Sequence, residues 1–164
     1  MTSLTGFKHL EQATNQQWFS IGFTSLRITL GVQFLWAGID KLGGWSASGF
    51  LSGSTGPFAA FFQSLAGNVV VDQLNVWGLI LIGLALIVGI FVRPAAFFSI
   101  ILMGLYYLAH FEQNTAHGLI DSHIIYIFIA ILFLAGGAGH VFGVDGLVFR
   151  QFRKPKLSAK ILFG

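Results

Sequence analysis

Two long apolar blocks stand back to back in the middle of the chain. The first covers residues 77–92 and the second residues 95–111, and only Arg93 and Pro94 separate them. In a lipid bilayer, the backbone N–H and C=O groups of a crossing segment must be satisfied within that segment, which makes such blocks helical. The pattern therefore predicts a membrane hairpin of two helices with one cation at its turn.

Four segments have the length and apolarity of membrane spans. We expect them at residues 18–39, 74–92, 94–111 and 122–139. Each is close to the ~20 residues that a helix needs to cross a bilayer. Pro94 falls in a first turn, where proline is tolerated because its missing N–H has no helical partner. The predicted fold class is all-α: a polytopic membrane protein built as a bundle of four transmembrane helices.

The connection between the first two expected spans is long and carries no charge from residue 43 to residue 71. Pro57 begins a candidate helix in this connection. Four apolar residues then recur at helical spacing: Phe58, Phe61, Phe62 and Leu65. We expect an interfacial helix in this first outer loop, lying on the outer leaflet. It serves either as a lid packed on the bundle or as a hydrophobic doorway for a lipid-soluble ligand, and the two roles are compatible.

Composition supports the membrane interpretation and excludes several kinds of chemistry. Of the 164 residues, 55% are hydrophobic and 9% are charged, whereas soluble domains carry about 25% charged residues. The absence of cysteine excludes disulfides, thiolate catalysis and cysteine-bound iron–sulfur clusters within this chain. The first seventeen residues are polar and contain no signal-peptide hydrophobic region.

The distribution of cations predicts the orientation in the membrane. Four spans place both termini on one side, together with Lys8, Arg93 and the basic residues of the last segment. The positive-inside rule assigns that side to the cytoplasm of a multi-pass protein in the cell membrane.

We divide the chain into a cytoplasmic arm (1–17), a four-helix membrane domain (18–147) and a basic cytoplasmic tail (148–164). Beside a membrane helix, such a tail favours anionic lipid over nucleic acid as its partner.

Arg27 lies inside the first expected span, where a cation costs a few kcal/mol unless it is paired or reaches the surface. Gly31 and Gly38 share its helix face, so we expect this face to pack against another helix. Two interpretations of Arg27 are open. It reaches the inner headgroups or binds carbonyls at the inner end of the fourth helix, near His140, or it contacts an anion or a quinone carbonyl as a substrate-binding residue.

The expected topology gathers polar residues at the outer rim of the bundle. They are Asp40, Lys41, His110, Glu112, His117, Asp121 and His123. Histidine titrates near neutrality, and Lys or Asp can hold a substrate oxygen, so this set is suited to binding an oxyanion or relaying protons to a quinone. The alternative is structural: Asp121 caps the fourth helix and His123 is an ordinary satisfied polar residue.

We assign provisional roles on this basis. The candidate catalytic residues are His110, Asp121 and His123, and the candidate substrate-binding residues are Arg27, Asp40, Lys41 and Tyr106. Tyr106 and His110 are four residues apart and share a helix face. The histidine spacing matches no compact metal-binding motif, and the glycines form no phosphate loop. We therefore predict no metal and no bound cofactor. The candidate co-substrate is a membrane quinone, which the polar residues of the outer rim would supply with protons.

The chain resembles the DoxX/DoxD family of small four-span membrane proteins, and within it the DoxD-like branch. The resemblance covers roughly residues 20–147. It is carried by Arg27 with Gly31, Phe34-Leu35, Gly38 and Asp40-Lys41-Leu42, by Gly49-Phe50 and GPFAAFFQSLAGN (56–68), by the hairpin at 77–111, by Asp121-Ser122-His123-Ile124-Ile125-Tyr126, and by GAGHVFGVDGL (137–147). His140 stands where the family pattern often has arginine.

The resemblance implies a subunit of a quinone-coupled oxidoreductase that oxidises thiosulfate and reduces a membrane quinone together with a second subunit. The alternative is a non-catalytic accessory or anchoring subunit of a larger membrane complex. A small-molecule transporter is disfavoured, because the four spans show no inverted repeat.

Overall fold

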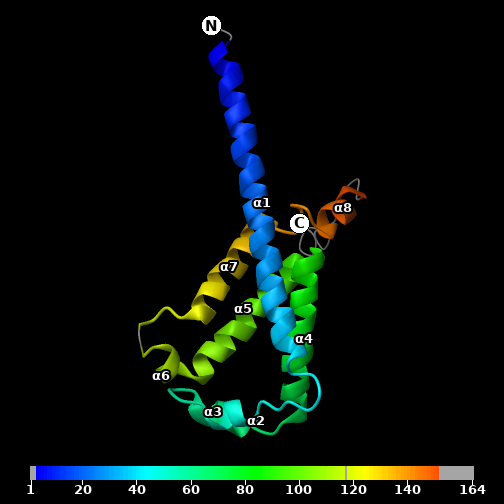
Figure 1. The fold of residues 1–164 in the computed structure, drawn as a ribbon. Coiled ribbons are helices and arrows are strands. Elements are labelled where there is room, and N and C mark those ends of the chain that lie inside the picture. Colours follow the sequence, from blue (N-terminus) through cyan, green and yellow to red (C-terminus); the bar gives the residue numbers. More distant parts are fainter. Residues whose placement is uncertain (1–2, 117, 152–164) are drawn as a thin grey trace.

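The computed structural model describes residues 3–116 and 118–151, and all regular elements of that part of the chain are helices. Four long helices form the body of the molecule (Figure 1): α1 (Ser3–Ile39), α4 (Val69–Val88), α5 (Val92–Ala109) and α7 (Ser122–Gly136). Four short helices lie at its two ends: α2 (Ser48–Ser52), α3 (Ala59–Ser64), α6 (Phe111–Asn114) and α8 (Val144–Gln151). We call the end with α2, α3 and α6 the lid end, and the end with the α4–α5 turn and α8 the hairpin end.

The predicted helical hairpin is confirmed: α4 and α5 follow each other with a three-residue turn at residues 89–91. The turn comes earlier than expected, so Arg93 lies in the first turn of α5 and not between the helices. Gly89 ends α4 because it adopts the left-handed conformation (φ 75°), which glycine adopts without steric cost. Gly137 ends α7 in the same way (φ 58°). Both helices therefore end at a glycine, a few residues before the expected boundaries at residues 92 and 139.

Helix α1 begins at Ser3 rather than near Trp18, so residues 3–17 of the expected arm are helical. Its N-terminal half extends beyond the other long helices at the hairpin end (Figure 1). Residues 152–164 of the predicted basic tail lie outside the described residues.

Two of the described helices, α4 and α5, are both long and apolar enough to cross a membrane. Helix α7 is apolar but has only 15 residues. These helices have many apolar side chains on their outer surfaces, for example Trp77, Leu81 and Phe128, each more than half exposed. Such a surface is unfavourable in water and natural in lipid.

Small residues bring α1 and α4 into backbone contact. A Cβ atom added to Gly31 of α1 would lie 2.9 Å from the carbonyl oxygen of Gly83, and one added to Gly38 would lie 2.9 Å from the backbone nitrogen of Ile80. Neither distance leaves room for a side chain, so the two helices could not approach this closely with alanine. The prediction that the Gly31–Gly38 face packs against another helix is confirmed.

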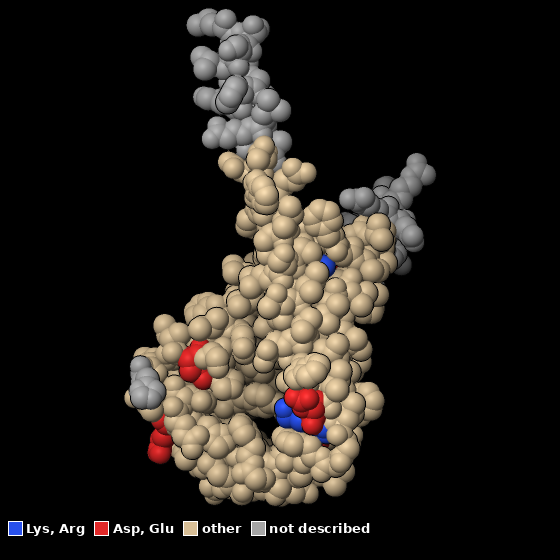
Figure 2. All heavy atoms as spheres, in the orientation of Figure 1, with Lys and Arg blue, Asp and Glu red and all other residues tan. Residues whose placement is uncertain are grey.

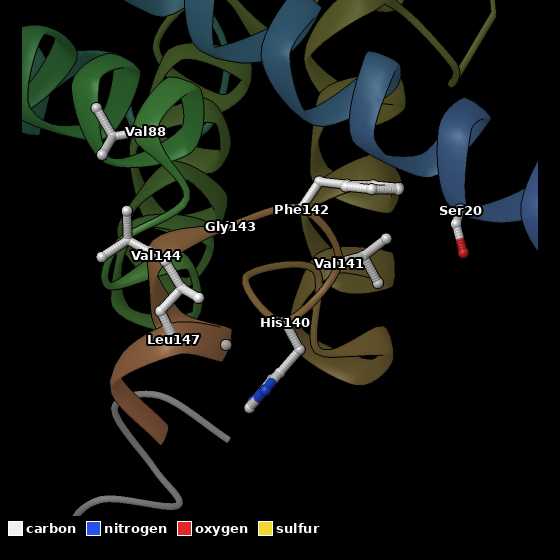
Figure 3. Close-up of a pocket in the computed structure, with 9 residues that line it drawn as sticks. Ser20, Val88, His140, Val141, Phe142, Gly143, Val144 and Leu147 are labelled. Carbon is white, nitrogen blue, oxygen red and sulfur yellow. The ribbon is translucent and has the colours of Figure 1, made fainter. Parts of the chain in front are cut away.

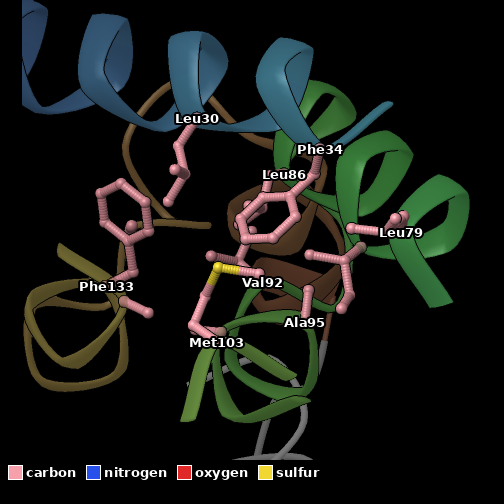
Figure 4. Close-up of a cluster of buried hydrophobic side chains, with 12 residues drawn as sticks. Leu30, Phe34, Leu79, Leu86, Val92, Ala95, Met103 and Phe133 are labelled. Carbon is pink, nitrogen blue, oxygen red and sulfur yellow. The ribbon is translucent and has the colours of Figure 1, made fainter. Parts of the chain in front are cut away.

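The main hydrophobic core lies where the four long helices meet (Figure 4). It contains Leu30 and Phe34 of α1, Leu79 and Leu86 of α4, Val92 and Met103 of α5, and Phe133 of α7. The rings of Phe23 and Phe133 meet edge to face, with centroids 5.5 Å apart, and join α1 to α7. This core fixes the positions of the helices whose ends carry the polar groups described below.

A second, smaller core attaches α2 and α3 to the lid end of the bundle. Its buried members are Ala47, Leu51, Phe62 and Ala109. Hydrogen bonds reinforce it: Asp72 of α4 accepts from Ala47 N at 2.8 Å, and Thr55 N donates to Ala109 O at 2.9 Å. Helix α3 thus forms in the expected place, but of its two phenylalanines only Phe62 is buried, while Phe61 and the N-cap residue Phe58 remain exposed. Helix α2 was not expected.

Candidate functional site

An apolar cavity of about 270 Å³ lies at the lid end, between the α2–α3 segment and the helices α4 and α5. We call it the lid cavity. Apolar side chains form nearly all of its wall: Ala47, Phe50, Leu51, Phe61, Phe62, Leu65, Val71, Leu74, Leu102, Leu105 and Ala109. The remaining two lining residues are polar, Asn75 of α4 and Tyr106 of α5. A mainly apolar pocket with a few convergent polar groups is typical of a small-molecule site.

The two polar lining residues are joined by a hydrogen bond, in which the Asn75 side-chain nitrogen donates to the Tyr106 hydroxyl oxygen. The Asn75 side-chain oxygen is buried and has no hydrogen-bond partner among the described residues. A buried amide oxygen without a partner costs free energy that a ligand donor would recover. The tyrosine hydroxyl, which accepts from Asn75, keeps its own proton for a ligand oxygen.

Asp121 and His123 form a hydrogen-bonded pair whose histidine ring packs against the ring of Tyr106. The Nδ1 atom of His123 and the carboxylate of Asp121 are hydrogen-bonded, and both side chains are partly buried. The His123 ring meets the Tyr106 ring edge to face, with centroids 6.0 Å apart. The other oxygen of Asp121 accepts from Ile124 N at 3.1 Å, which confirms that Asp121 caps α7. The structure thus brings three of the predicted site residues together, and Asp121 has two roles.

His110 reaches the same site through Phe50. Its Nε2 atom is 2.9 Å from the Phe50 carbonyl oxygen, and the two rings pack with centroids 4.3 Å apart. Phe50 in turn lines the lid cavity and contacts the Tyr106 ring at 5.5 Å. His110 therefore holds a wall of the cavity in place and is absent from the lining. Its Nδ1 atom is buried without a hydrogen-bond partner in the described part of the chain.

Asp40 and Lys41 follow the end of α1 and have other contacts. The Lys41 ammonium donates to Ala37 O at 2.9 Å and lies 5.1 Å from the centre of the Trp45 ring. Burial lowers the pKa of Lys41, and the nearby Asp40 carboxylate partly opposes that shift. Asp40 is exposed. Neither residue lines the lid cavity, so the structure separates this pair from Tyr106 and His123.

Arg27 lies at the opposite end of the molecule, fully buried at the hairpin end. Its Nη1 atom donates to Ala138 O at 2.6 Å and to Val141 O at 3.2 Å, and its Nη2 atom donates to Phe142 O at 3.1 Å. Of the two interpretations of Arg27, binding to carbonyls after the fourth helix is the one that the geometry shows. The carbonyls belong to the loop that contains His140, close to the expected place.

Asp145 is a further residue at the hairpin end, which the sequence analysis included only in the segment GAGHVFGVDGL (137–147). It is 1% exposed, and its two carboxylate oxygens accept from Phe91 N at 2.8 Å and Val92 N at 3.0 Å. Phe91 is in the left-handed conformation (φ 53°), which costs free energy for a residue other than glycine. Asp145 therefore caps α5 from α8 and stabilises a strained turn.

A shallow hollow of about 580 Å³ also lies at the hairpin end (Figure 3). Val88 of α4, Ser20 of α1 and the loop residues His140, Val141 and Phe142 line it, and the His140 ring points away from the loop backbone. This hollow is larger than the lid cavity but more open. Backbone and apolar groups form most of its wall, and it contains none of the predicted catalytic residues.

Charged side chains are sparse on the face shown in Figure 2, where wide uncharged areas separate a few acidic and basic groups. Among the described residues, which exclude His117, no three His, Asp or Glu side chains are grouped closely enough to hold a metal ion. The lid cavity thus stands out by its apolar wall and its paired amide and hydroxyl. Asn75 was missed by the sequence analysis, although it is a polar residue inside an expected span, which is a recognised signal for function.

Comparison with known proteins identifies the family. The DoxX family model matches residues 22–111. No curated protein and no solved structure matches the chain. The matched segment is more than half of the chain and contains every residue that lines the lid cavity, whereas Asp121, His123 and Asp145 follow it. The chain belongs to the DoxX family, whose members are generally membrane proteins.

Proposed function

We propose that this chain is the membrane subunit of a quinone-coupled oxidoreductase, and that its lid cavity holds the quinone ring. The observation that carries the proposal is the cavity itself: an apolar space of about 270 Å³ in which a hydroxyl and an amide converge. A quinone ring is flat and apolar, and its two oxygens accept hydrogen bonds. The Tyr106 hydroxyl donates to one of these oxygens in the proposed complex.

The proposed setting is a bundle of four spans in the cell membrane. Helices α4, α5 and α7 cross the membrane together with the part of α1 that packs against α4. The hairpin end, with Arg93 and Arg27, then faces the cytoplasm together with both termini, in accordance with the positive-inside rule. The lid end faces outward, so that a quinone enters from lipid and a water-soluble reductant arrives from outside.

The resemblance to the DoxD-like branch suggests thiosulfate as that reductant. In the balanced reaction, two thiosulfate ions lose one electron each and join through a new S–S bond as tetrathionate, while the quinone takes up both electrons and two protons to become the quinol. The Asp121–His123 pair, which contacts the Tyr106 ring, is the proposed source of the protons. A partner subunit with a redox centre is part of the proposal, because this chain has no cysteine.

A direct binding measurement tests the quinone site. Purified protein in detergent micelles is titrated with tetramethyl-p-benzoquinone by calorimetry, with empty micelles as the reference. Tyr106→Phe removes the donor to the quinone oxygen, and Asn75→Leu removes the amide that orients the Tyr106 hydroxyl. We expect each to weaken binding about tenfold, which corresponds to about 1.4 kcal/mol. Tyr107→Phe is the matched control, because the Tyr107 hydroxyl donates to Leu119 O outside the cavity. Equal affinity in all four proteins, or no binding to the wild type, would refute the proposal.

A non-catalytic anchoring subunit is the second candidate, and the projection of α1 favours it. Trp18 and Phe19 are 68% and 67% exposed on a helix that extends beyond the rest of the bundle. Such a surface suits a contact with another subunit. Replacing Asp121, His123 and Lys41 with small neutral residues separates the two functions: lost turnover in an intact complex supports the oxidoreductase, and lost assembly without a kinetic defect supports the anchor.

A further inference from the structure

The lid cavity is closed toward the core but open on its lipid-facing side. Three of its lining side chains are strongly exposed: Phe61 of α3 at 58%, Leu74 of α4 at 69% and Leu105 of α5 at 43%. They belong to three different helices and surround an opening between α4 and α5. At about 270 Å³, the cavity is slightly smaller than the 300–1,000 Å³ of pockets that enclose drug-sized ligands, so a ring fits but a long tail does not.

The seam between α4 and α5 continues from this opening along the helices. A second, wholly apolar hollow of about 350 Å³ lies nearer the hairpin end, and Leu81 and Ala85 of α4 line it together with Pro94 and Phe98 of α5. No polar side chain contributes to its wall. The two hollows therefore involve the same pair of helices at different depths.

Helical geometry places both hollows on the same side of the seam. On α4, Leu74, Leu81 and Ala85 lie within an arc of about 40° at 100° per residue. On α5, the corresponding residues Pro94, Phe98 and Leu105 also lie within about 40°. The distance from Leu74 to Ala85 is about 16 Å along the axis at 1.5 Å per residue. The seam thus presents a straight apolar stripe that begins at the mouth of the cavity.

Gly78 keeps this stripe open between its two hollows. It lies about 20° beyond the edge of the α4 arc, one turn after Leu74, and a Cβ atom added to it would meet no atom within 4 Å. This differs from Gly31, Gly38 and Gly83, where an added Cβ would collide with the neighbouring helix. Close helix packing therefore explains those three glycines but leaves Gly78 without a packing role.

We infer that the α4–α5 seam is the binding groove for the isoprenoid tail of the quinone whose ring occupies the lid cavity. This inference rests on the proposed function and specifies its substrate class: a quinone with a long tail that enters sideways from the membrane. The ring lies beyond Leu74 and Leu105, and the tail runs past Gly78 toward the second hollow. Its apolar chain gains contact with Leu81 and Phe98 where loosely packed lipid would otherwise lie.

Two ligands with the same head group but different tails test the groove. Purified wild-type protein in detergent micelles is titrated by calorimetry with tetramethyl-p-benzoquinone and with trimethyl-p-benzoquinone that carries a farnesyl chain. Gly78→Leu fills the stripe one turn beyond Leu74 and replaces no lining residue of the lid cavity. Gly104→Leu is the matched control, because its added Cβ is also free of contacts within 4 Å but lies roughly opposite Leu102 on α5.

We expect the wild type to bind the farnesyl compound at least about tenfold more tightly than the tailless one, and Gly78→Leu to remove that difference. Gly104→Leu retains it, and both variants bind the tailless ring as the wild type does.

Equal affinities in the wild type, or a preference that survives in Gly78→Leu, would overturn the inference alone. Release of a tightly held phospholipid by Gly78→Leu, without any tail preference, would also overturn it and assign the groove to lipid. If the wild type binds neither compound, the proposed function itself fails.

Discussion

The two ends of the bundle use polar groups in opposite ways. At the hairpin end, the terminal nitrogens of Arg27 and both carboxylate oxygens of Asp145 are bound to backbone atoms. At the lid end, Asn75 lines the lid cavity and keeps a buried side-chain oxygen without a partner among the described residues. Arg27 Nε is also buried without a partner among the described residues, but it faces no apolar cavity. The backbone hydrogen bonds of Arg27 and Asp145 stabilise a fixed junction, whereas an unmet acceptor in the wall of an apolar cavity leaves capacity for a ligand. The hairpin end is thus held by backbone hydrogen bonds, and the proposed ligand site lies at the lid end.

Loss of Arg27 should cause the largest effect. Arg27→Met leaves three loop carbonyls without donors and removes the cation near Asp145, so we expect the free energy of unfolding to fall by about 3–5 kcal/mol. Denaturant unfolding in mixed micelles measures it. The free energy of unfolding should fall less in Arg27→Lys, because lysine keeps the charge although it lacks the forked geometry of arginine. A stable Arg27→Met that no longer binds tetramethyl-p-benzoquinone would make Arg27 a ligand contact and contradict the comparison.

Loss of the Asp145 carboxylate should cause the second-largest loss of stability. In Asp145→Asn, one amide oxygen replaces two carboxylate acceptors, so Phe91 N or Val92 N is left unpaired beside an uncompensated Arg27. The expected loss is about 1–3 kcal/mol, with quinone affinity unchanged, by the same unfolding and calorimetric measurements. Asp40→Asn, at an exposed carboxylate, is the control and should leave stability within about 0.5 kcal/mol of the wild type.

The contrast between local and distant signals explains what the sequence could predict. The hairpin follows from two adjacent apolar blocks. The ends of α4 and α7 were expected at residues 92 and 139, although Gly89 and Gly137, which end these helices, are local signals. The Asp121 cap is equally local. Asp145, in contrast, caps residues that lie 53 and 54 positions earlier, and no short-range pattern reveals such a partner.

The same limit applies to the candidate site. Tyr106 and His123 were both assigned to the candidate site at the outer end of the bundle, and their rings do meet. Asn75, in contrast, reaches Tyr106 across 31 positions. The extra length of α1 has no apolar signal, because its first residues are mostly polar. Helix propensity is the relevant signal there, since Glu, Gln and Ala are good helix formers.

Opening the lid should have a smaller and more local effect. Asp72→Leu removes the acceptor for the buried Ala47 N–H and so weakens the attachment of α2 and α3. We expect hydrogen exchange across residues 47–66 to accelerate about tenfold, which corresponds to about 1.4 kcal/mol of local opening. Exchange in the core of α4 and α5 should not change. Uniform acceleration through the whole bundle would show that the lid is part of the main cooperative unit and not a separate cover.

The smallest effect concerns Lys41, the half-buried cation of the lid end. Burial lowers its pKa in the folded state, so the folded protein disfavours the charge relative to the unfolded chain. Between that lowered pKa and the ordinary value near 10.5, the unfolded chain binds more protons, and stability must therefore rise with pH in this window. Lys41→Met should remove this rise and leave the melting temperature at neutral pH unchanged or slightly higher, as measured by thermal scans across the alkaline range. Arg27→Met, in contrast, should destabilise the protein because loop carbonyls lose their donor. A Lys41→Met protein as unstable as Arg27→Met would show that the two ends contribute equally to stability, contrary to this prediction.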